Sequence, residues 1–255
     1  FDDGSIIKKK SSVELVKALN NVSFELYEGE TLGLVGESGS GKSTIAKIIT
    51  GLVKPSNGSI SYYDQSLYNE KLKYKFFQNK GEIQMIFQDP YSSLNPRFKV
   101  KDIIAEPLKF YQKEMSQDEL TSNVNDLIDI VGMTRQSLER YPHEFSGGQR
   151  QRISIARSLA TRPRLLICDE PTSALDVSIQ AQILNLLKDI QDELHLTMLF
   201  ISHDLPVIRQ MCNRIVVLRN GNVCETNDSE KLFIEPQHEY TKELINLMPK
   251  IDSII

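Results

Sequence analysis

The sequence predicts an α/β fold with a mainly parallel sheet. Two short apolar runs, "RLLICDE" and "TMLFISHD", have the composition of strands that are buried on both faces. Between them, "SIQAQILNLLKDIQDEL" spaces its apolar residues as an amphipathic helix does, at Ile179, Ile183, Leu186, Leu187, Ile190 and Leu194. A strand, a helix and a strand in this order form a βαβ unit, in which the two strands are parallel.

The N-terminal part predicts further strands joined by tight turns. "NVSFELYEGET" alternates apolar and polar residues around Glu28-Gly29, and "TLGLVG" is a short apolar strand. "SNGSISYY" carries Asn57-Gly58, a dipeptide typical of β-hairpins. "KSTIAKIITG" predicts a helix that ends near Gly51 and has its apolar spacing at Ile45, Ile48 and Ile49.

A helical segment separates these strands from the βαβ unit. "DELTSNVNDLIDIVGM" places one apolar face at Leu120, Val124, Leu127, Ile128 and Val131. "QRQRISIARSLATRP" predicts another helix, with Pro163 beyond its end and with inward residues Ile153, Ala156 and Ala160. After the βαβ unit, "RIVVLRNGNVCE" predicts a hairpin that turns at Asn220-Gly221.

Composition restricts the class of protein. The 255 residues are 40% hydrophobic, which suffices for a substantial core, and the net charge of −4 gives no electrostatic case for a nucleic-acid partner. Cys168, Cys212 and Cys224 lack metal-ligand spacing, so we expect reduced thiols in a cytosolic protein. No apolar run is close to the length of about 18 residues that a transmembrane helix needs. If the protein functions at a membrane, we therefore expect a partner protein to attach it there.

A phosphate-binding loop is the most specific motif. "GESGSGKS" matches G-x-x-x-x-G-K-[ST] in full and lies between a predicted strand and a predicted helix. Its glycines allow backbone N–H groups to curl around phosphate oxygens, Lys42 reaches the β- and γ-phosphates, and the Ser43 hydroxyl ligates Mg²⁺. The sequence therefore predicts ATP and Mg²⁺ at Gly36, Glu37, Ser38, Gly39, Ser40, Gly41, Lys42, Ser43 and Thr44.

An acidic pair ends the strand "RLLICDE". Ligand sites of parallel sheets lie beyond the carboxyl ends of the strands, which is where Asp169 and Glu170 fall. Because successive strand side chains point in opposite directions, the two carboxylates are expected to have different roles. Asp169 is predicted to hold Mg²⁺ and Glu170 to act as the general base toward the attacking water.

The stretch "FSGGQ" opens the helix before that strand. By itself it is explained by an ordinary helix N-cap. However, the continuous run "FSGGQRQRISIARSLATRPRLLICDEPTSALD" resembles the signature, Walker B and D-loop of ATP-binding cassette (ABC) ATPases, and the resemblance extends over essentially the whole chain. It implies a P-loop NTPase of the ABC type, with an antiparallel β-subdomain and a helical subdomain beside the parallel sheet.

The resemblance also implies roles for further residues. In this family two nucleotide-binding domains dimerise head to tail, so that the signature of one contacts the γ-phosphate bound by the other. The residues that would act in this way are Ser146, Gly147, Gly148 and Gln149, with Asp176 of "SALD" also contacting the partner. "IFQDP" supplies Gln88 as the Q-loop residue that touches Mg²⁺ or water, and "FISHD" supplies His203 as the switch histidine. Phe1 is the candidate for the aromatic that stacks on adenine.

The domain organisation expected from this resemblance is a single ABC ATPase domain over 1–255. Its core comprises 1–88 and 163–235, its helical subdomain about 89–162, and its C-terminal extension 236–255.

Two stretches indicate a branch of the family. "QDPYSSLNPR" and "QHEYTKELINLMP" resemble the branch that energises oligopeptide, dipeptide and nickel importers, although Glu239 stands where that branch usually has proline. The partners implied are membrane permease subunits, a second ATPase subunit, identical or related, and indirectly an extracellular substrate-binding protein. The location implied is the cytoplasmic side of the membrane. A soluble ABC ATPase without a transport role, an exporter ATPase and a small-molecule kinase of the P-loop class remain as alternatives.

Overall fold

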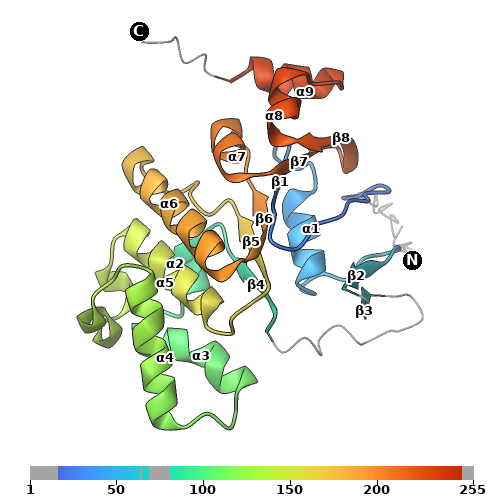
Figure 1. The fold of residues 1–255 in the computed structure, drawn as a ribbon. Coiled ribbons are helices and arrows are strands. Elements are labelled where there is room, and N and C mark those ends of the chain that lie inside the picture. Colours follow the sequence, from blue (N-terminus) through green and yellow to red (C-terminus); the bar gives the residue numbers. More distant parts are fainter. Residues whose placement is uncertain (1–16, 64, 69–80, 249–255) are drawn as a thin grey trace, which may run out of the picture.

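A six-stranded sheet forms the centre of the molecule (Figure 1). The computed structural model describes residues 17–63, 65–68 and 81–248. The strand order is β4-β5-β6-β1-β7-β8, and every neighbouring pair is parallel except β7 and β8. The strands are β1 Thr31–Val35, β4 Ile83–Ile86, β5 Leu165–Asp169, β6 Thr197–Ile201, β7 Arg214–Arg219 and β8 Asn222–Asp228. The predicted mainly parallel sheet is confirmed.

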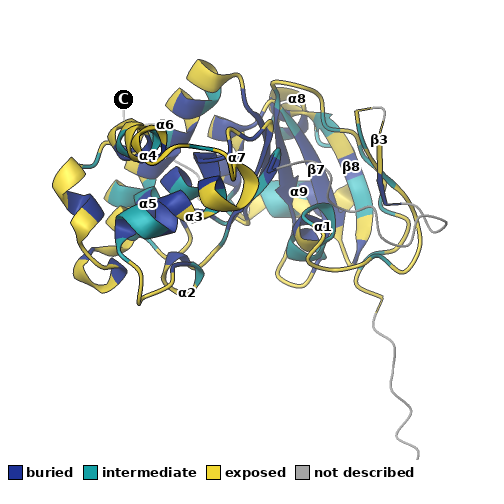
Figure 2. Cartoon of the chain, turned by 90° about the horizontal axis from the view of Figure 1, so that it is seen from below, coloured by how far each residue is buried: buried dark blue, intermediate teal, exposed yellow. Residues whose placement is uncertain are grey.

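Apolar side chains cover both faces of the sheet. Leu32 and Leu34 of β1 pack on one face with Ile45 of α1 (Lys42–Ile49). Val35 of the same strand packs on the other face, in a cluster that includes residues of α6 and α7. This division follows from the two-residue repeat of a strand. Figure 2 shows the strands as the buried middle of the molecule, which explains why their sequences are continuously apolar.

The helical region, residues 90–159, packs against this sheet. It consists of α2 Pro90–Ser93, α3 Val100–Tyr111, α4 Gln117–Ile130, the short 3₁₀ turns Arg135–Glu139 and Pro142–Glu144, and α5 Gly147–Leu159. The five residues predicted to form one apolar face, four in α4 and Val131 directly after it, are all buried. The predicted inward residues of α5 and its C-cap, Ile153, Ala156 and Ala160, are buried as well. A capping box at Ser116 and Glu119 starts α4 by satisfying N–H groups of its first turn.

The helix of the βαβ unit is α6, Val177–Leu194, between β5 and β6. Ile183, Leu187 and Ile190 are buried as predicted. The expectation for Leu194 is wrong, because this side chain is 48% exposed. It is the last residue of α6, where His195 adopts a left-handed conformation and the chain turns away toward β6.

Two expectations for the N-terminal part are also wrong. Gly58 has a positive φ of 108°, but no hairpin forms there. Instead β2 (Ile60–Tyr62) pairs with the following strand β3 (Gln65–Tyr68), so the turn comes after β2. Residues 21–26 do not form a strand, although Val22 and Phe24 pack on the cluster around α1. Alternating polarity predicts that every second side chain is buried. An extended segment can bury these side chains without hydrogen bonding to a neighbouring strand.

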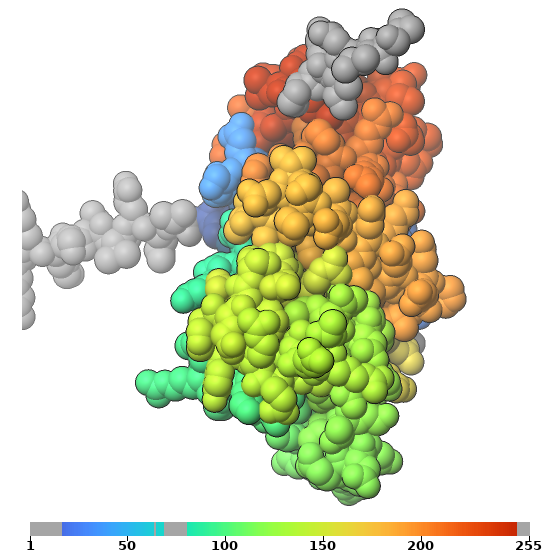
Figure 3. Space-filling model, turned by 90° about the vertical axis from the view of Figure 1, so that its left-hand side faces the viewer, coloured from blue at the N-terminus to red at the C-terminus, as the bar shows by residue number. Residues whose placement is uncertain are grey.

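Three further helices lie in the C-terminal part: one between β6 and β7, and two after β8. These are α7 Leu205–Met211, α8 Ser229–Ile234 and α9 Glu239–Asn246. The predicted hairpin between β7 and β8 is confirmed: Asn220 and Gly221 have φ values of 47° and 74°, as a type I′ turn requires. Figure 3 shows α8 and α9, in red, and the helical region, in green, at opposite ends of the molecule. None of the helices in the described ranges combines the length and hydropathy needed to cross a bilayer.

Candidate functional site

The predicted phosphate-binding loop, residues 36–41, joins β1 to α1 at the carboxyl edge of the sheet. The loop is closely packed at two glycines with positive φ. A Cβ on Gly36 would lie 2.2 Å from the carbonyl oxygen of Leu218, and one on Gly41 would lie 2.6 Å from a methyl carbon of Leu19. Only glycine fits these two positions, and the close packing fixes the path of the loop.

Lys42 lies inside the curve of this loop. Its Nζ donates hydrogen bonds to the carbonyl oxygens of Gly36 at 2.6 Å and Glu37 at 2.9 Å. Burial lowers the pKa of Lys42, while the nearby carboxylates of Glu170 and Asp169 act in the opposite direction. The loop therefore holds a buried cationic group where the sequence predicts phosphate. Ser40 is also buried, whereas residues 37–39 are exposed at the rim.

Ser43 and Asp169 meet at the start of α1. Ser43 Oγ donates a hydrogen bond to Asp169 Oδ1 at 3.1 Å. Burial raises the pKa of Asp169, and the hydrogen bond from Ser43 opposes that rise. The contact joins the phosphate-binding loop to the end of β5, so Ser43 and Asp169, two of the three residues predicted to reach Mg²⁺, lie together.

Glu170 follows Asp169 in an unusual backbone conformation. Its φ is 47°, and its backbone N–H donates to the carbonyl oxygen of Ile201 at 2.9 Å. A non-glycine residue in the left-handed region costs free energy and is found preferentially at functional sites. The turn ends β5 and places the two adjacent carboxylates in different surroundings, as the sequence predicts.

The carboxylate of Glu170 lies between the two other predicted catalytic side chains. Gln88 Nε2 donates to Glu170 Oε2 at 3.0 Å. His203 Nδ1 lies 3.2 Å from Glu170 Oε1. The three residues follow β4, β5 and β6, which are neighbours in the sheet, so their parallel order brings the side chains together at one edge.

The predicted signature residues begin α5. Ser146 Oγ accepts a hydrogen bond from the Gln149 N–H, and Gln149 Oε1 accepts one from the Ser146 N–H, which forms a capping box. Gly148 is buried against α6, where a Cβ would lie 2.4 Å from Ile179 Cγ2. Ser146, Gly147 and Gln149 are exposed. Ser146, Gly148 and Gln149 line a surface pocket together with Arg152 and Gln182.

The structure does not join this signature to the phosphate-binding loop of the same chain. Within the described residues, the side-chain hydrogen bonds of Ser146 and Gln149 are to each other. Asp176 is the exposed N-cap residue of α6 and makes no side-chain capping bond. Thr44 lies in the first turn of α1 and is half-buried. The predicted adenine-stacking residue Phe1 lies outside the described residues.

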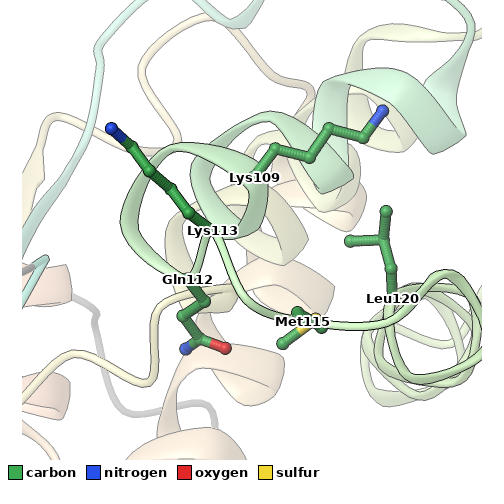
Figure 4. A pocket seen from close by; sticks show the side chains of 5 residues that line it. All are labelled: Lys109, Gln112, Lys113, Met115 and Leu120. Carbon is green, nitrogen blue, oxygen red and sulfur yellow. The ribbon is translucent and has the colours of Figure 1, made fainter.

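A second pocket lies in the helical region, between the end of α3 and the start of α4 (Figure 4). None of the residues predicted to bind nucleotide or metal lines it. Its lining side chains are Lys109, Gln112, Lys113, Met115 and Leu120.

Sequence reasoning missed a contact between the C-terminal part of the chain and the phosphate-binding loop. Tyr240 of α9 is buried, and its hydroxyl accepts a hydrogen bond from the backbone N–H of Glu37 at 3.1 Å. The only signal in the sequence is an aromatic residue in the predicted C-terminal extension, which does not indicate the loop.

Comparison with known proteins agrees with the fold and the motifs. A family model described as "ABC transporter" matches residues 19–173. The oligopeptide transport ATP-binding protein OppF of Lactococcus lactis subsp. lactis (strain IL1403) is 50% identical over 237 residues, which cover 93% of this chain and 74% of the relative. The protein of the same name from Escherichia coli (strain K12) is 47% identical over 234 residues, covering 92% of this chain and 70% of the relative.

Solved structures show the same architecture. The ATP-binding cassette MJ0796, in a dimeric post-hydrolysis state bound to ADP and Pi, is 32% identical with a TM-score of 0.74, covering 87% of this chain and 94% of that chain. CbiO1 from Clostridium perfringens, part of the ABC transporter complex cbiONQ, is 28% identical with a TM-score of 0.75, covering 92% of this chain and 90% of that chain. From its motifs, its fold and these relatives, the chain belongs to the ABC transporter family.

Proposed function

We propose that this chain is the ATP-hydrolysing subunit of a bacterial importer for oligopeptides. The observation that carries the proposal is the placement of Glu170 between Gln88 and His203, beside the Ser43–Asp169 pair and Lys42. The similarity to proteins named OppF supplies the class of transported substrate. A nickel-chelate or dipeptide cargo is the second candidate, from the same branch of the family.

The phosphate-binding loop would hold the β- and γ-phosphates of ATP. The first turn of α1 has backbone N–H groups without partners within the helix, and the helix dipole favours an anion there. Lys42 would exchange its hydrogen bonds with the Gly36 and Glu37 carbonyl oxygens for bonds to phosphate oxygens. After this exchange the buried ammonium of Lys42 would contact negatively charged phosphate oxygens instead of neutral carbonyl oxygens.

Ser43 and Asp169 form a donor set that fits Mg²⁺. Both offer oxygen atoms, which this ion prefers, and they lie within hydrogen-bonding distance of each other at the phosphate end of the site. Gln88 is the third residue proposed to reach the ion. When bound, Mg²⁺ would neutralise charge on the phosphate oxygens.

Glu170 would act as the general base. Its carboxylate would accept a proton from the water that attacks the γ-phosphorus, while the bond to the oxygen bridging to the β-phosphate breaks and ADP leaves with the bonding pair. Gln88 and His203 would hold the carboxylate in the orientation in which it receives that proton. They follow β4 and β6, the strands on either side of β5, which Glu170 follows.

The signature and D-loop residues would contact the nucleotide that is bound by a second cassette. These residues are Ser146, Gly147, Gly148, Gln149 and Asp176. Three of the four signature residues, and Asp176, are exposed on the surface of the chain. The hydroxyl of Ser146 and the N-terminus of α5 are suited to a γ-phosphate presented by a partner. The partner is a second copy of this chain or a related ATPase subunit.

The membrane partners would contact the surface near Gln88. Tyr91, three residues further on, is 61% exposed, and the Arg150 guanidinium lies 4.7 Å from the centre of its ring. We propose that a permease helix docks here and that the chain is held at the cytoplasmic side of the membrane in this way. Movement of the Gln88 segment would then report nucleotide state to the permease.

Affinity purification tests the transporter assignment. Tagged chain is recovered from gently solubilised membranes, and the proteins that accompany it are identified. We expect two multi-span permeases, with or without a second ATPase, and an associated binding protein that captures oligopeptides. Recovery of only ribosomal or DNA-associated partners would overturn the transport assignment while leaving the ATPase chemistry intact.

A further inference from the structure

Tyr240 connects the C-terminal extension to the phosphate-binding loop. It lies in α9, is only 1% exposed, and its Oη accepts the hydrogen bond from Glu37 N at 3.1 Å across 203 residues of sequence. Glu37 is the second residue of the glycine-rich motif, so the contact reaches the beginning of the loop.

The same peptide unit is held from its other side by Lys42. The peptide bond between Gly36 and Glu37 carries the Gly36 carbonyl and the Glu37 N–H at opposite ends. The carbonyl accepts from Lys42 Nζ at 2.6 Å, while the N–H donates to Tyr240. Because a peptide is planar, the bond to Tyr240 also fixes the direction of the carbonyl that holds the lysine.

Neighbouring contacts keep this peptide and the tyrosine in place. A Cβ added to Gly36 would lie 2.2 Å from the Leu218 carbonyl oxygen, so the loop passes close to β7 at this residue. The Arg219 guanidinium lies 4.5 Å from the centre of the Tyr240 ring. The ring is therefore held by the same strand that supports the loop.

The start of α9 is anchored to β8. The Glu225 carboxylate accepts hydrogen bonds from the backbone N–H groups of Gln237 at 3.0 Å and His238 at 2.9 Å. Burial raises the pKa of Tyr240, and the hydrogen bond from Glu37 opposes that rise. The anchored start of α9 fixes the position of Tyr240, and the raised pKa keeps its hydroxyl protonated.

We propose that Tyr240 is a positioning residue for nucleotide binding: through the Gly36–Glu37 peptide it sets the position from which Lys42 reaches the phosphates when ATP enters the loop. The inference rests on the proposed function of the loop as the site of the ATP phosphates. It gives the C-terminal extension a role at the nucleotide, since α9 forms part of the support of the loop. The position of α9 on β8 therefore affects affinity for ATP.

The test compares Tyr240→Phe with Tyr68→Phe. Both replacements remove one hydroxyl from a buried ring, and the Tyr68 hydroxyl donates to the Pro55 carbonyl at 3.2 Å, outside the loop. We expect Tyr240→Phe to raise the Kd for ATP, and the KM, about three- to tenfold, the consequence of losing one hydrogen bond, with kcat at saturating ATP retained. Tyr68→Phe should leave the Kd unchanged.

A structural readout separates positioning from general loosening. In ¹⁵N-labelled protein the amide signal of Glu37 should shift in Tyr240→Phe and not in Tyr68→Phe. A wild-type Kd in Tyr240→Phe would overturn the proposal, whether or not the Glu37 signal shifts, and so would an unshifted Glu37 signal. Lys42→Ala is measured in parallel. If this variant binds ATP as the wild type does, the proposed phosphate-binding role of the loop is wrong. If Lys42→Ala loses ATP binding while Tyr240→Phe keeps the wild-type Kd, only the role of Tyr240 is rejected.

Discussion

Ser43 and Asp169 are separated by 126 residues in the sequence and joined by a 3.1 Å hydrogen bond from Oγ to Oδ1. The bond links the first turn of α1 to the last residue of β5. It brings together a hydroxyl and a carboxylate at the point where phosphate and Mg²⁺ are proposed to bind.

Ser43→Ala is expected to weaken the contribution of Mg²⁺ to ATP binding. Removing the hydroxyl takes away one oxygen donor and the hydrogen-bond partner of Asp169, a change that commonly costs about 10- to 100-fold in metal affinity. Titration of ATP with Mg²⁺ and with a chelator measures the effect. Thr50→Val, at the other end of the same helix, is the matched control. An equal loss of affinity in the presence of chelator would contradict the metal role.

Asp169→Asn is expected to change the pH dependence of stability in the nucleotide-free protein. Burial raises the pKa of Asp169 in the folded state, so the folded state binds this proton more tightly than the unfolded chain, whose aspartate has a pKa of about 3.9. The contribution of Asp169 to stability therefore falls as pH rises from that value through the raised pKa, and is constant above it.

The variant lacks this titration, so its advantage in Tm over the wild type should grow with pH across that window. Thermal unfolding of both proteins in buffers of increasing pH gives the comparison. A Tm difference that is independent of pH would show that the carboxylate is not penalised by its burial.

Glu170→Gln is expected to lower the rate of phosphate release by at least about 100-fold, the usual contribution of a general base. The amide has the shape of the carboxylate but cannot accept the proton from water. ATP binding should persist, because the side-chain contacts of Glu170 within the described residues are with Gln88 and His203 and not with the phosphate-binding loop. Phosphate release and ATP affinity are measured on the same preparation. Undiminished turnover would remove Glu170 from the proposed role.

Gly148→Ala is expected to destabilise the junction of α5 with α6. The added Cβ would lie 2.4 Å from Ile179 Cγ2, and overpacking of this kind costs about 1–3 kcal/mol. The gain in helix propensity from glycine to alanine, about 1 kcal/mol, is too small to offset the upper part of that range. Urea unfolding measures the difference. Adding Ile179→Ala should reduce the cost; a double variant less stable than the sum of both single changes would contradict the proposed clash.

The core of the site was predictable because its residues are carried by short local patterns. The phosphate-binding loop needs only glycines, a lysine and a serine between a strand and a helix, and the parallel order of β4, β5 and β6 then brings Gln88, Glu170 and His203 together. The residue roles and the limits of the subdomains remain predictions.

Contacts between distant segments were not predictable. Nothing near Tyr240 indicates that its hydroxyl meets Glu37, because that contact depends on how α9 packs on β8. The error at Asn57-Gly58 has a different origin. Gly58 adopts the positive φ that the dipeptide favours, but a turn becomes a hairpin only where both flanking segments find ladder partners, and β2 finds its partner after the turn at Tyr63.

The central claim is tested most directly by ATP hydrolysis in proteoliposomes that contain the purified membrane complex of this chain together with its binding protein. Phosphate release is measured with and without a mixture of oligopeptides, for the wild type and for Glu170→Gln. We predict hydrolysis that increases on addition of peptide in the wild type and is lost in the variant. Hydrolysis that does not respond to peptides in the complete complex would contradict the assignment as an oligopeptide importer subunit.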